Sequence, residues 1–173
     1  MISVQTSVQS LFENAEPLFG RPVGDTNVQA LLSSLGHWPP PQFSEDEFII
    51  YVEDKPHGYC LKLDEASTVK NPIVAGIPEG TPVLVGCFFF SEGVDGYRQF
   101  SGRLPRDILW SDGPETVLKK VGAPKFEFKN KTTGVLSTHR WDCGAWHLTV
   151  KYRDDGKSVR HINADLRLVL NPK

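Results

Sequence analysis

The sequence predicts an α+β fold in which an antiparallel β-sheet is covered on one face by short helices. Three observations lead to this prediction. Apolar residues follow helical spacing only in short stretches, at 7–18, 26–35 and 114–121. Alternating or continuous apolar runs, separated by glycine and proline, fill most of the remaining chain. The order is two helices, at least three strands, one short helix and four more strands, which is typical of antiparallel meanders.

Two amphipathic helices are expected near the N-terminus. In the first, residues 7–18, the following apolar side chains share one face: Val8, Leu11, Phe12, Ala15 and Leu18. The second covers residues 26–35. Asp25 or Thr26 is expected to cap it, because either side chain can accept hydrogen bonds from the free backbone amides of the first turn. Gly36 then ends the helical pattern.

A proline run follows the second helix. Trp38-Pro39-Pro40-Pro41 must be extended, since proline lacks an amide donor and restricts the residue before it. Such a segment is typical of a rigid connector or of a docking motif. We interpret it as a connector and keep Trp38 as a candidate partner contact.

Three strands are expected next. Residues 48–53 and 57–64 flank the turn Asp54-Lys55-Pro56 and form a predicted hairpin. Residues 82–90 are apolar on both faces, which is typical of a strand in the interior of a sheet.

The segment 100–124 joins a strand end to a short helix. Asp112 is expected to cap this helix, Pro114 suits its first turn and Gly122 ends it. The apolar and glycine positions of this helix lie 86 residues after those of the second helix, matching Val117, Leu118, Val121 and Gly122 to Leu31, Leu32, Leu35 and Gly36. We therefore predict two imperfectly repeated helix-and-meander modules, 1–92 and 93–173, packed as one globular unit.

Four strands complete the chain, at 126–129, 138–143, 145–153 and 157–168. A two-residue loop in the last hairpin would place apolar residues opposite polar ones. A loop with Gly156 in the left-handed conformation instead pairs Leu148 with Ile162, and it separates the two faces better. That register buries Trp146, Leu148, Ile162, Ala164, Leu166 and Leu168 against the helices.

The polar face of this hairpin is the candidate surface for a partner. Its predicted contacts are His147, Thr149, Lys151, His161, Asn163, Asp165 and Arg167, with Trp38 as a further contact.

Composition excludes several classes of function. The chain carries 19 Lys and Arg against 21 Asp and Glu, a net charge of -2, which does not favour nucleic acid or an acidic membrane as a partner. The first residues resemble no signal peptide, and no apolar run is long enough to span a bilayer. Three widely spaced cysteines indicate reduced thiols and a cytoplasmic protein.

Catalytic motifs are absent from the sequence. No nucleophile elbow, phosphate-binding loop, dinucleotide fingerprint or HExxH pattern occurs. His139, Cys143 and His147 are spaced by four, but four residues of strand span about 13 Å, whereas a nucleophile and its base must be about 3 Å apart. We therefore expect no enzyme, no metal and no cofactor. The alternative is a ligand-binding or metal-binding protein, or an enzyme, that uses His139, Cys143 and His161.

The segment from Phe100 to Pro124, followed by Trp146, residues 148–152, Gly156 and Val159, resembles a family of bacterial immunity proteins. The short helix with its glycine-x-proline ending is also similar to the modules of β-lactamase-inhibitor-like folds. The resemblance implies a non-catalytic cytoplasmic protein that binds a cognate toxin, such as a type VI or contact-dependent effector, and covers its active site. A module that binds another protein constitutively is a further hypothesis.

Overall fold

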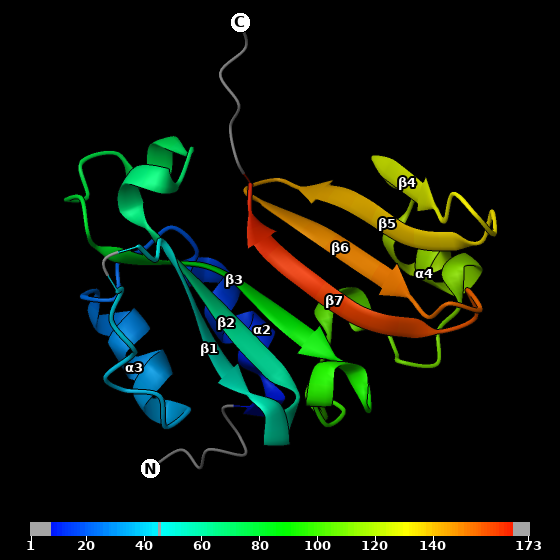
Figure 1. Cartoon of the computed structure of the whole chain (residues 1–173), viewed down its shortest axis with the longest axis horizontal. Helices are drawn as coiled ribbons and strands as arrows, with labels where there is room; N and C mark the ends of the chain where they lie inside the picture. Colours follow the sequence, from blue (N-terminus) through cyan, green and yellow to red (C-terminus); the bar gives the residue numbers. More distant parts are fainter. Residues whose placement is uncertain (1–7, 45, 168–173) are drawn as a thin grey trace, which may run out of the picture.

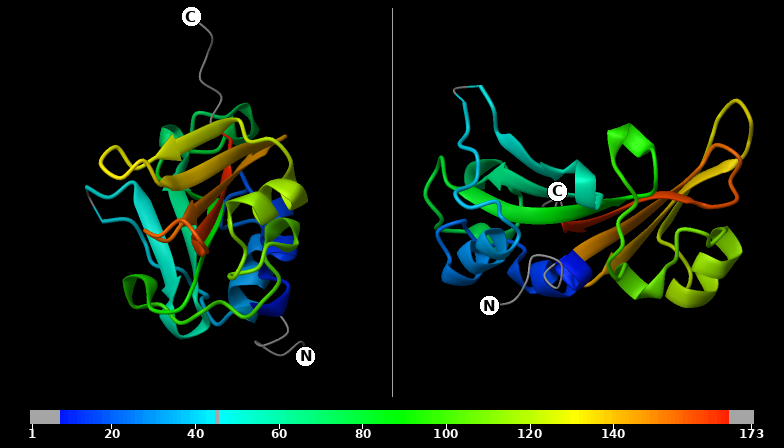
Figure 2. Two further views of the ribbon diagram at one scale, coloured as in Figure 1. Left: turned by 90° about the vertical axis from the view of Figure 1, so that its right-hand side faces the viewer. Right: turned by 90° about the horizontal axis from the view of Figure 1, so that it is seen from below.

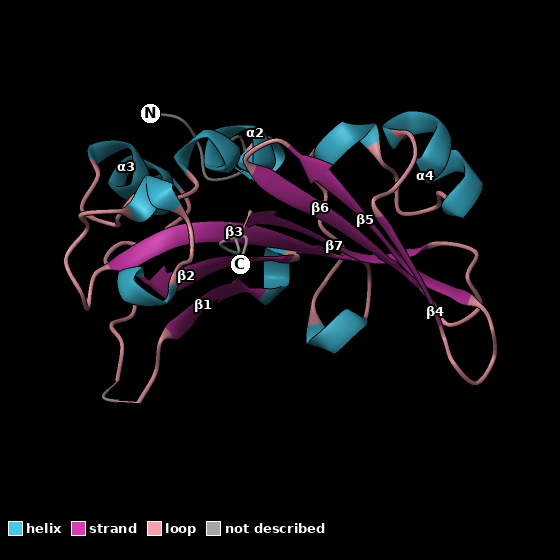
Figure 3. Ribbon diagram, turned by 90° about the horizontal axis from the view of Figure 1, so that it is seen from above, coloured by secondary structure: helices cyan, strands magenta, loops and turns pink. Residues whose placement is uncertain are grey.

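The protein folds around one seven-stranded antiparallel sheet with short helices on one face (Figures 1 and 3). This computed structural model describes residues 8–44 and 46–167. The strand order is β1-β2-β3-β7-β6-β5-β4. The predicted α+β fold class is confirmed.

The strands lie close to their predicted positions. They are β1 (Ile49–Asp54), β2 (Tyr59–Glu65), β3 (Pro82–Phe90), β4 (Phe126–Lys129), β5 (Leu136–Cys143), β6 (Trp146–Tyr152) and β7 (Val159–Leu166). Because β3 pairs with β2 on one side and with β7 on the other, its predicted interior position is confirmed.

The helices α2 (Leu11–Ala15), α3 (Thr26–Ser34) and α4 (Pro114–Val121) lie on the same side of the sheet (Figure 3). The first is shorter than predicted, since the chain tightens into a 3-10 turn at Glu16–Leu18, where Pro17 cannot donate a hydrogen bond. Asp25 caps α3 by accepting hydrogen bonds from the Asn27 and Val28 amides at 2.8 and 3.4 Å.

The predicted cap of α4 is wrong. Gly113 occupies the N-cap position, and no side chain caps the helix. Asp112 is buried and turns away from the helix start. Its Oδ2 accepts hydrogen bonds from the Leu109 amide and from Lys120 Nζ, both at 2.7 Å. The carboxylate therefore closes the turn before α4. It also pairs with Lys120, which lies in the last turn of that helix.

The register of the last hairpin differs from the prediction by two residues. Leu148 lies opposite Ala164, and Val150 lies opposite Ile162. The loop is longer than predicted, because the amide of Val159 donates to Trp110 O at 3.1 Å and a bulge follows Lys151. Gly156 does adopt the left-handed conformation, with φ at 67°. Since side chains alternate with a period of two, a two-residue shift leaves every residue on its predicted face.

Each half of the chain runs from helix to meander, and the halves meet where β3 pairs with β7 (Figure 1). Hydrogen bonds continue across this seam, so one sheet passes through both halves. The division into repeated modules at 1–92 and 93–173 stays a prediction.

The main core lies between the sheet and the helices, and its most deeply buried side chains include Leu11, Leu32, Leu61, Leu148 and Ile162. The other face is here called the open face, and part of it is covered by the chain itself. The segment 91–99 folds over its β2–β3 end (Figure 2). In this segment Tyr97 stacks on Phe90, with ring centroids 3.9 Å apart. Tyr97 also donates a 2.7 Å hydrogen bond to Glu53 Oε1.

Candidate partner-binding face

The strand registers arrange the side chains of the open face in three transverse rows. The first row is Glu53, Cys60, Phe88, Asn163, Thr149, Arg140 and Phe126. The central row is Tyr51, Lys62, Gly86, Asp165, His147 and Asp142. The third row is Phe90, His161, Lys151, Thr138 and Phe128.

The six predicted contacts from β6 and β7 all belong to these rows, but their exposure differs. Lys151 is exposed, as is Arg167 directly after β7. Thr149, Asn163, Asp165 and His161 are half-buried, and His147 is buried. Leu168, predicted to be buried, lies outside the described residues.

Trp38 is 42% exposed but lies apart from these rows. It lines a separate apolar pocket with Val23, Pro82 and the proline run. The structure therefore does not join Trp38 to the polar hairpin face.

Two histidines of the open face are held neutral by burial. Burial lowers the pKa of His147, and Arg140 nearby lowers it further. His147 Nδ1 lies 2.8 Å from Asp142 Oδ1, although the two atoms are not aligned for a hydrogen bond. Burial also lowers the pKa of His161 to about 4, helped by the positive charges of Lys151 and Arg160. Neither ring is suited to serve as an exposed cation for a partner.

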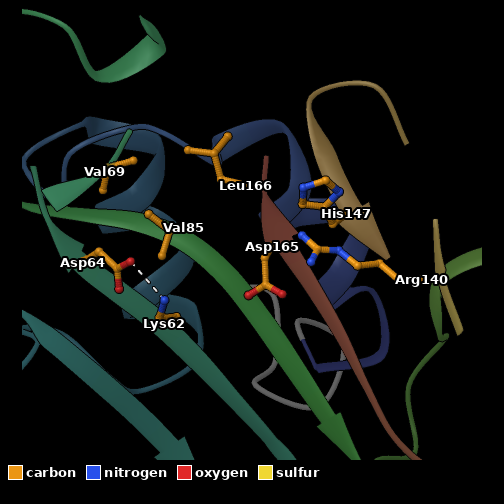
Figure 4. Close-up of a pocket in the computed structure, with 8 residues that line it drawn as sticks. All are labelled: Lys62, Asp64, Val69, Val85, Arg140, His147, Asp165 and Leu166. Carbon is orange, nitrogen blue, oxygen red and sulfur yellow. Dashed lines mark hydrogen bonds and ion pairs between the residues drawn. The ribbon is translucent and has the colours of Figure 1, made fainter. Parts of the chain in front are cut away.

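The centre of the open face contains a polar pocket of about 240 Å³ between β2, β7, β6 and β5 (Figure 4). Lys62, Asp64, Arg140, His147 and Asp165 supply its polar groups. Lys62 Nζ lies 3.0 Å from Asp64 Oδ2. Burial raises the pKa of Asp165 to about 6, against the opposing effect of Lys62 and Arg140.

Large apolar side chains are exposed at both ends of the open face. At the β1 edge, Ile49 and Tyr51 are 43% and 51% exposed. At the β4 edge, Phe126 and Phe128 are 46% and 52% exposed, with ring centroids 6.3 Å apart. These four residues were not among the predicted contacts. The alternation in 48–53 and 126–129 was the signal for them, but the faces of those strands could be assigned only once their pairing was known.

The alternative catalytic or metal-binding set is not assembled. His139 and Cys143 point toward the helices, and His139 is fully buried, with Nδ1 3.0 Å from the Tyr152 hydroxyl. His161 lies on the opposite face, and so does His147. Within the described ranges, no group of three or more His, Cys, Asp and Glu could hold a metal ion, and no helix is long and apolar enough to cross a bilayer.

No known protein family and no curated protein matches this sequence. Two solved structures follow a similar chain course. A DUF4309 family protein from Bacillus subtilis has a TM-score of 0.46 and 13% identity, over 95% of this chain and 98% of its own. A cysteine-rich secretory protein from Staphylococcus aureus has a TM-score of 0.42 and 10% identity, over 89% of this chain and 48% of its own. The case for a function therefore depends on the geometry of the open face.

Proposed function

We propose that this chain is a non-catalytic cytoplasmic protein that binds a cognate protein toxin through its open face and neutralises it by covering the active site. The observation that carries the binding role is the placement of exposed Ile49, Tyr51, Phe126 and Phe128 at both ends of one sheet face, around a charged centre. Aromatic residues and arginine are enriched in protein interfaces. The toxin as partner follows from the resemblance of the segment 100–124 to immunity proteins.

A binding role also agrees with the separation of the candidate catalytic groups. His139 is enclosed and hydrogen-bonded on the helix side, while His161 is half-buried on the other face. A nucleophile and a base must be within hydrogen-bond reach of each other. His139 and His161 therefore do not form such a pair. The open face can instead bind a partner through its shape, apolar contacts and charge.

The test compares a face variant with a matched control. Tyr51→Ala/Phe126→Ala removes one exposed aromatic from each end of the open face. Ile73→Ala/Leu109→Ala removes two apolar side chains of similar exposure, 55% and 57%, from outside the three rows. Each tagged protein is used for affinity capture from its native cells, and the eluates are analysed by native mass spectrometry.

We expect wild type and control to elute with one larger protein in a stoichiometric complex, and the face variant to elute alone. An anchor residue of an interface contributes about 2 kcal/mol, or roughly 30-fold in affinity, so loss of two should abolish capture. The captured protein is then expressed with each variant. Growth rescued by wild type and control, but not by the face variant, supports neutralisation. A partner that binds both variants equally would show that the interface lies elsewhere.

A further inference from the structure

The central pocket has a charged floor and an apolar wall. Lys62, Arg140 and Asp165 line it at the level of the sheet, and Val69, Val85 and Leu166 enclose it from one side (Figure 4). Its volume of about 240 Å³ is below the roughly 300–1,000 Å³ of small-molecule sites. It is large enough for a single amino-acid side chain.

Gly86 lies in the central row, between Lys62 and Asp165. A Cβ at this position would be 2.8 Å from Ala164 O and 2.9 Å from Asp165 Oδ1. The missing side chain lets the carboxylate of Asp165 approach strand β3.

Three side chains of this site have a buried polar atom without a hydrogen-bond partner: Asp64 Oδ1, Arg140 Nε and His147 Nδ1. Asp64 is paired with Lys62 and His147 lies beside Asp142, so Arg140 is the one of the three without an opposite charge next to it. Its side chain extends from β5 toward Asp165, with the guanidinium beside His147 (Figure 4). Its Nε is buried without a hydrogen-bond partner, and no carboxylate of the described residues lies within ion-pair distance of it. The nearest candidate on its own strand, Asp142, is instead close to His147 at 2.8 Å and Arg167 at 3.9 Å. A half-buried guanidinium whose Nε lacks an acceptor is unfavourable, and a carboxylate is the group whose geometry it matches.

We propose that this pocket receives an acidic side chain of the bound partner, whose carboxylate is held by Arg140 and whose aliphatic stem packs on Val69, Val85 and Leu166. The identity of the occupant rests on the proposed function, whereas the affinity of the pocket for a carboxylate does not. Lys62 adds a second positive charge at the opposite side of the pocket, although it is already paired with Asp64.

A proton on Asp165 favours the same occupant. The charged or titratable groups facing Asp165 are Lys62 and Asp64 on β2, Arg140 on β5 and His147 on β6. An incoming carboxylate repels the ionised form of Asp165, but it can accept a hydrogen bond from the protonated form. Binding of an acidic group should therefore be tighter at pH 6 than at pH 8, and Asp165→Asn should remove much of that dependence. A lysine or arginine occupant would show the opposite trend.

The first experiment uses propionate, which has the structure of a glutamate side chain, and propionamide as its neutral isostere. Each is titrated into ¹⁵N-labelled protein while the Arg140 Nε–Hε resonance is followed by NMR. We expect a saturable shift at millimolar propionate and none with propionamide. Arg140→Gln should abolish the associated backbone shifts on β5 and β6, and Arg140→Lys should retain a weaker response. Arg106→Gln, an exposed arginine on the helix side, is the control. Equal responses to the two probes, or no response, would overturn the carboxylate site.

The second experiment tests the source of the carboxylate with the captured partner. Arg140→Gln should weaken the complex by about 30-fold or more, as expected when a buried charge pair is lost, whereas Arg106→Gln should not. The complex should no longer respond to propionate, because the pocket is filled. If the complex still binds propionate and is unaffected by Arg140→Gln, the pocket serves a free small carboxylate and the partner assignment is overturned. If no partner is captured, the proposed function fails while the propionate result still decides the chemistry of the pocket.

Discussion

Replacing Asp165 by asparagine should stabilise the protein above neutral pH and leave it almost unchanged in acid. Burial raises the pKa of this carboxyl from 3.8 to about 6. Between these values the native state binds more protons than the unfolded chain, so the free energy of unfolding falls as the pH rises. At 1.36 kcal/mol per pH unit, the loss amounts to about 3 kcal/mol between pH 4 and pH 7. Asparagine has no charge to bury and avoids this loss.

The pH dependence of wild-type stability alone would not reveal the contribution of Asp165, because His161 changes the free energy of unfolding in the opposite direction. Its pKa is lowered from 6.5 to about 4, so here the unfolded chain binds more protons. The free energy of unfolding therefore rises with pH across almost the same window, by about 3 kcal/mol. The two contributions nearly cancel in the wild type. Only the difference between wild type and the Asp165→Asn variant isolates the carboxyl.

Urea unfolding at half-unit steps from pH 4 to pH 8 measures this difference. We expect it to be close to zero at pH 4 and to reach about 3 kcal/mol in favour of the variant by pH 7. Asp154→Asn, on an exposed turn, controls for the loss of one carboxylate. A difference that does not change with pH would refute the assignment of Asp165 as a buried acid.

Three further predictions concern other residues of the sheet and of the segment that covers it. Gly86→Ala should destabilise the fold by roughly 1–3 kcal/mol in urea unfolding, because its Cβ would meet backbone, while Gly24→Ala, with nothing within 4 Å, should not. Cys60, whose pKa burial raises to about 12, should resist iodoacetamide at pH 7.5, and half-buried Cys143 should be modified first in peptide mass spectra. Tyr97→Phe should cost about 1 kcal/mol by removing a hydrogen bond, and hydrogen exchange should show faster opening of residues 91–99.

The faces of the last hairpin could be predicted because every second residue of a strand lies on the same face, whichever residues it pairs with. The register was wrong by two residues, yet every side chain stayed on its predicted face. Loop length was the missing information: the amide of Val159 bonds to Trp110, which is distant in sequence, and no local pattern indicates such a contact.

The central pocket could not be predicted, since it depends on strands that are far apart in the chain. Gly86 and Asp165 become neighbours only through the pairing of β3 with β7. Arg140 could have been predicted. Its neighbour Trp141 is apolar and buried, so alternation places Arg140 on the polar face. It was missed because the predicted contacts of that face were taken only from the last hairpin. Asp112 shows the limit of capping rules. Its position just before a helix predicts an N-cap, yet its carboxylate accepts hydrogen bonds from the Leu109 amide and from Lys120.

The seam between β3 and β7 has a consequence for synthesis of the chain. Strand β3 is apolar on both faces. Residues 82–84 bond to residues 20–23, but the edge at 86–90 is covered only when residues 159–166 have been made. At about 5–20 residues per second, a ribosome needs roughly 4–15 seconds to pass from the end of β3 to the end of β7. During that interval the first half displays an unpaired apolar strand edge, the feature that most readily recruits another chain. The nascent protein is therefore most prone to aggregate in the seconds before its last hairpin emerges, and a chaperone that shields residues 86–90 would raise its yield most at that stage.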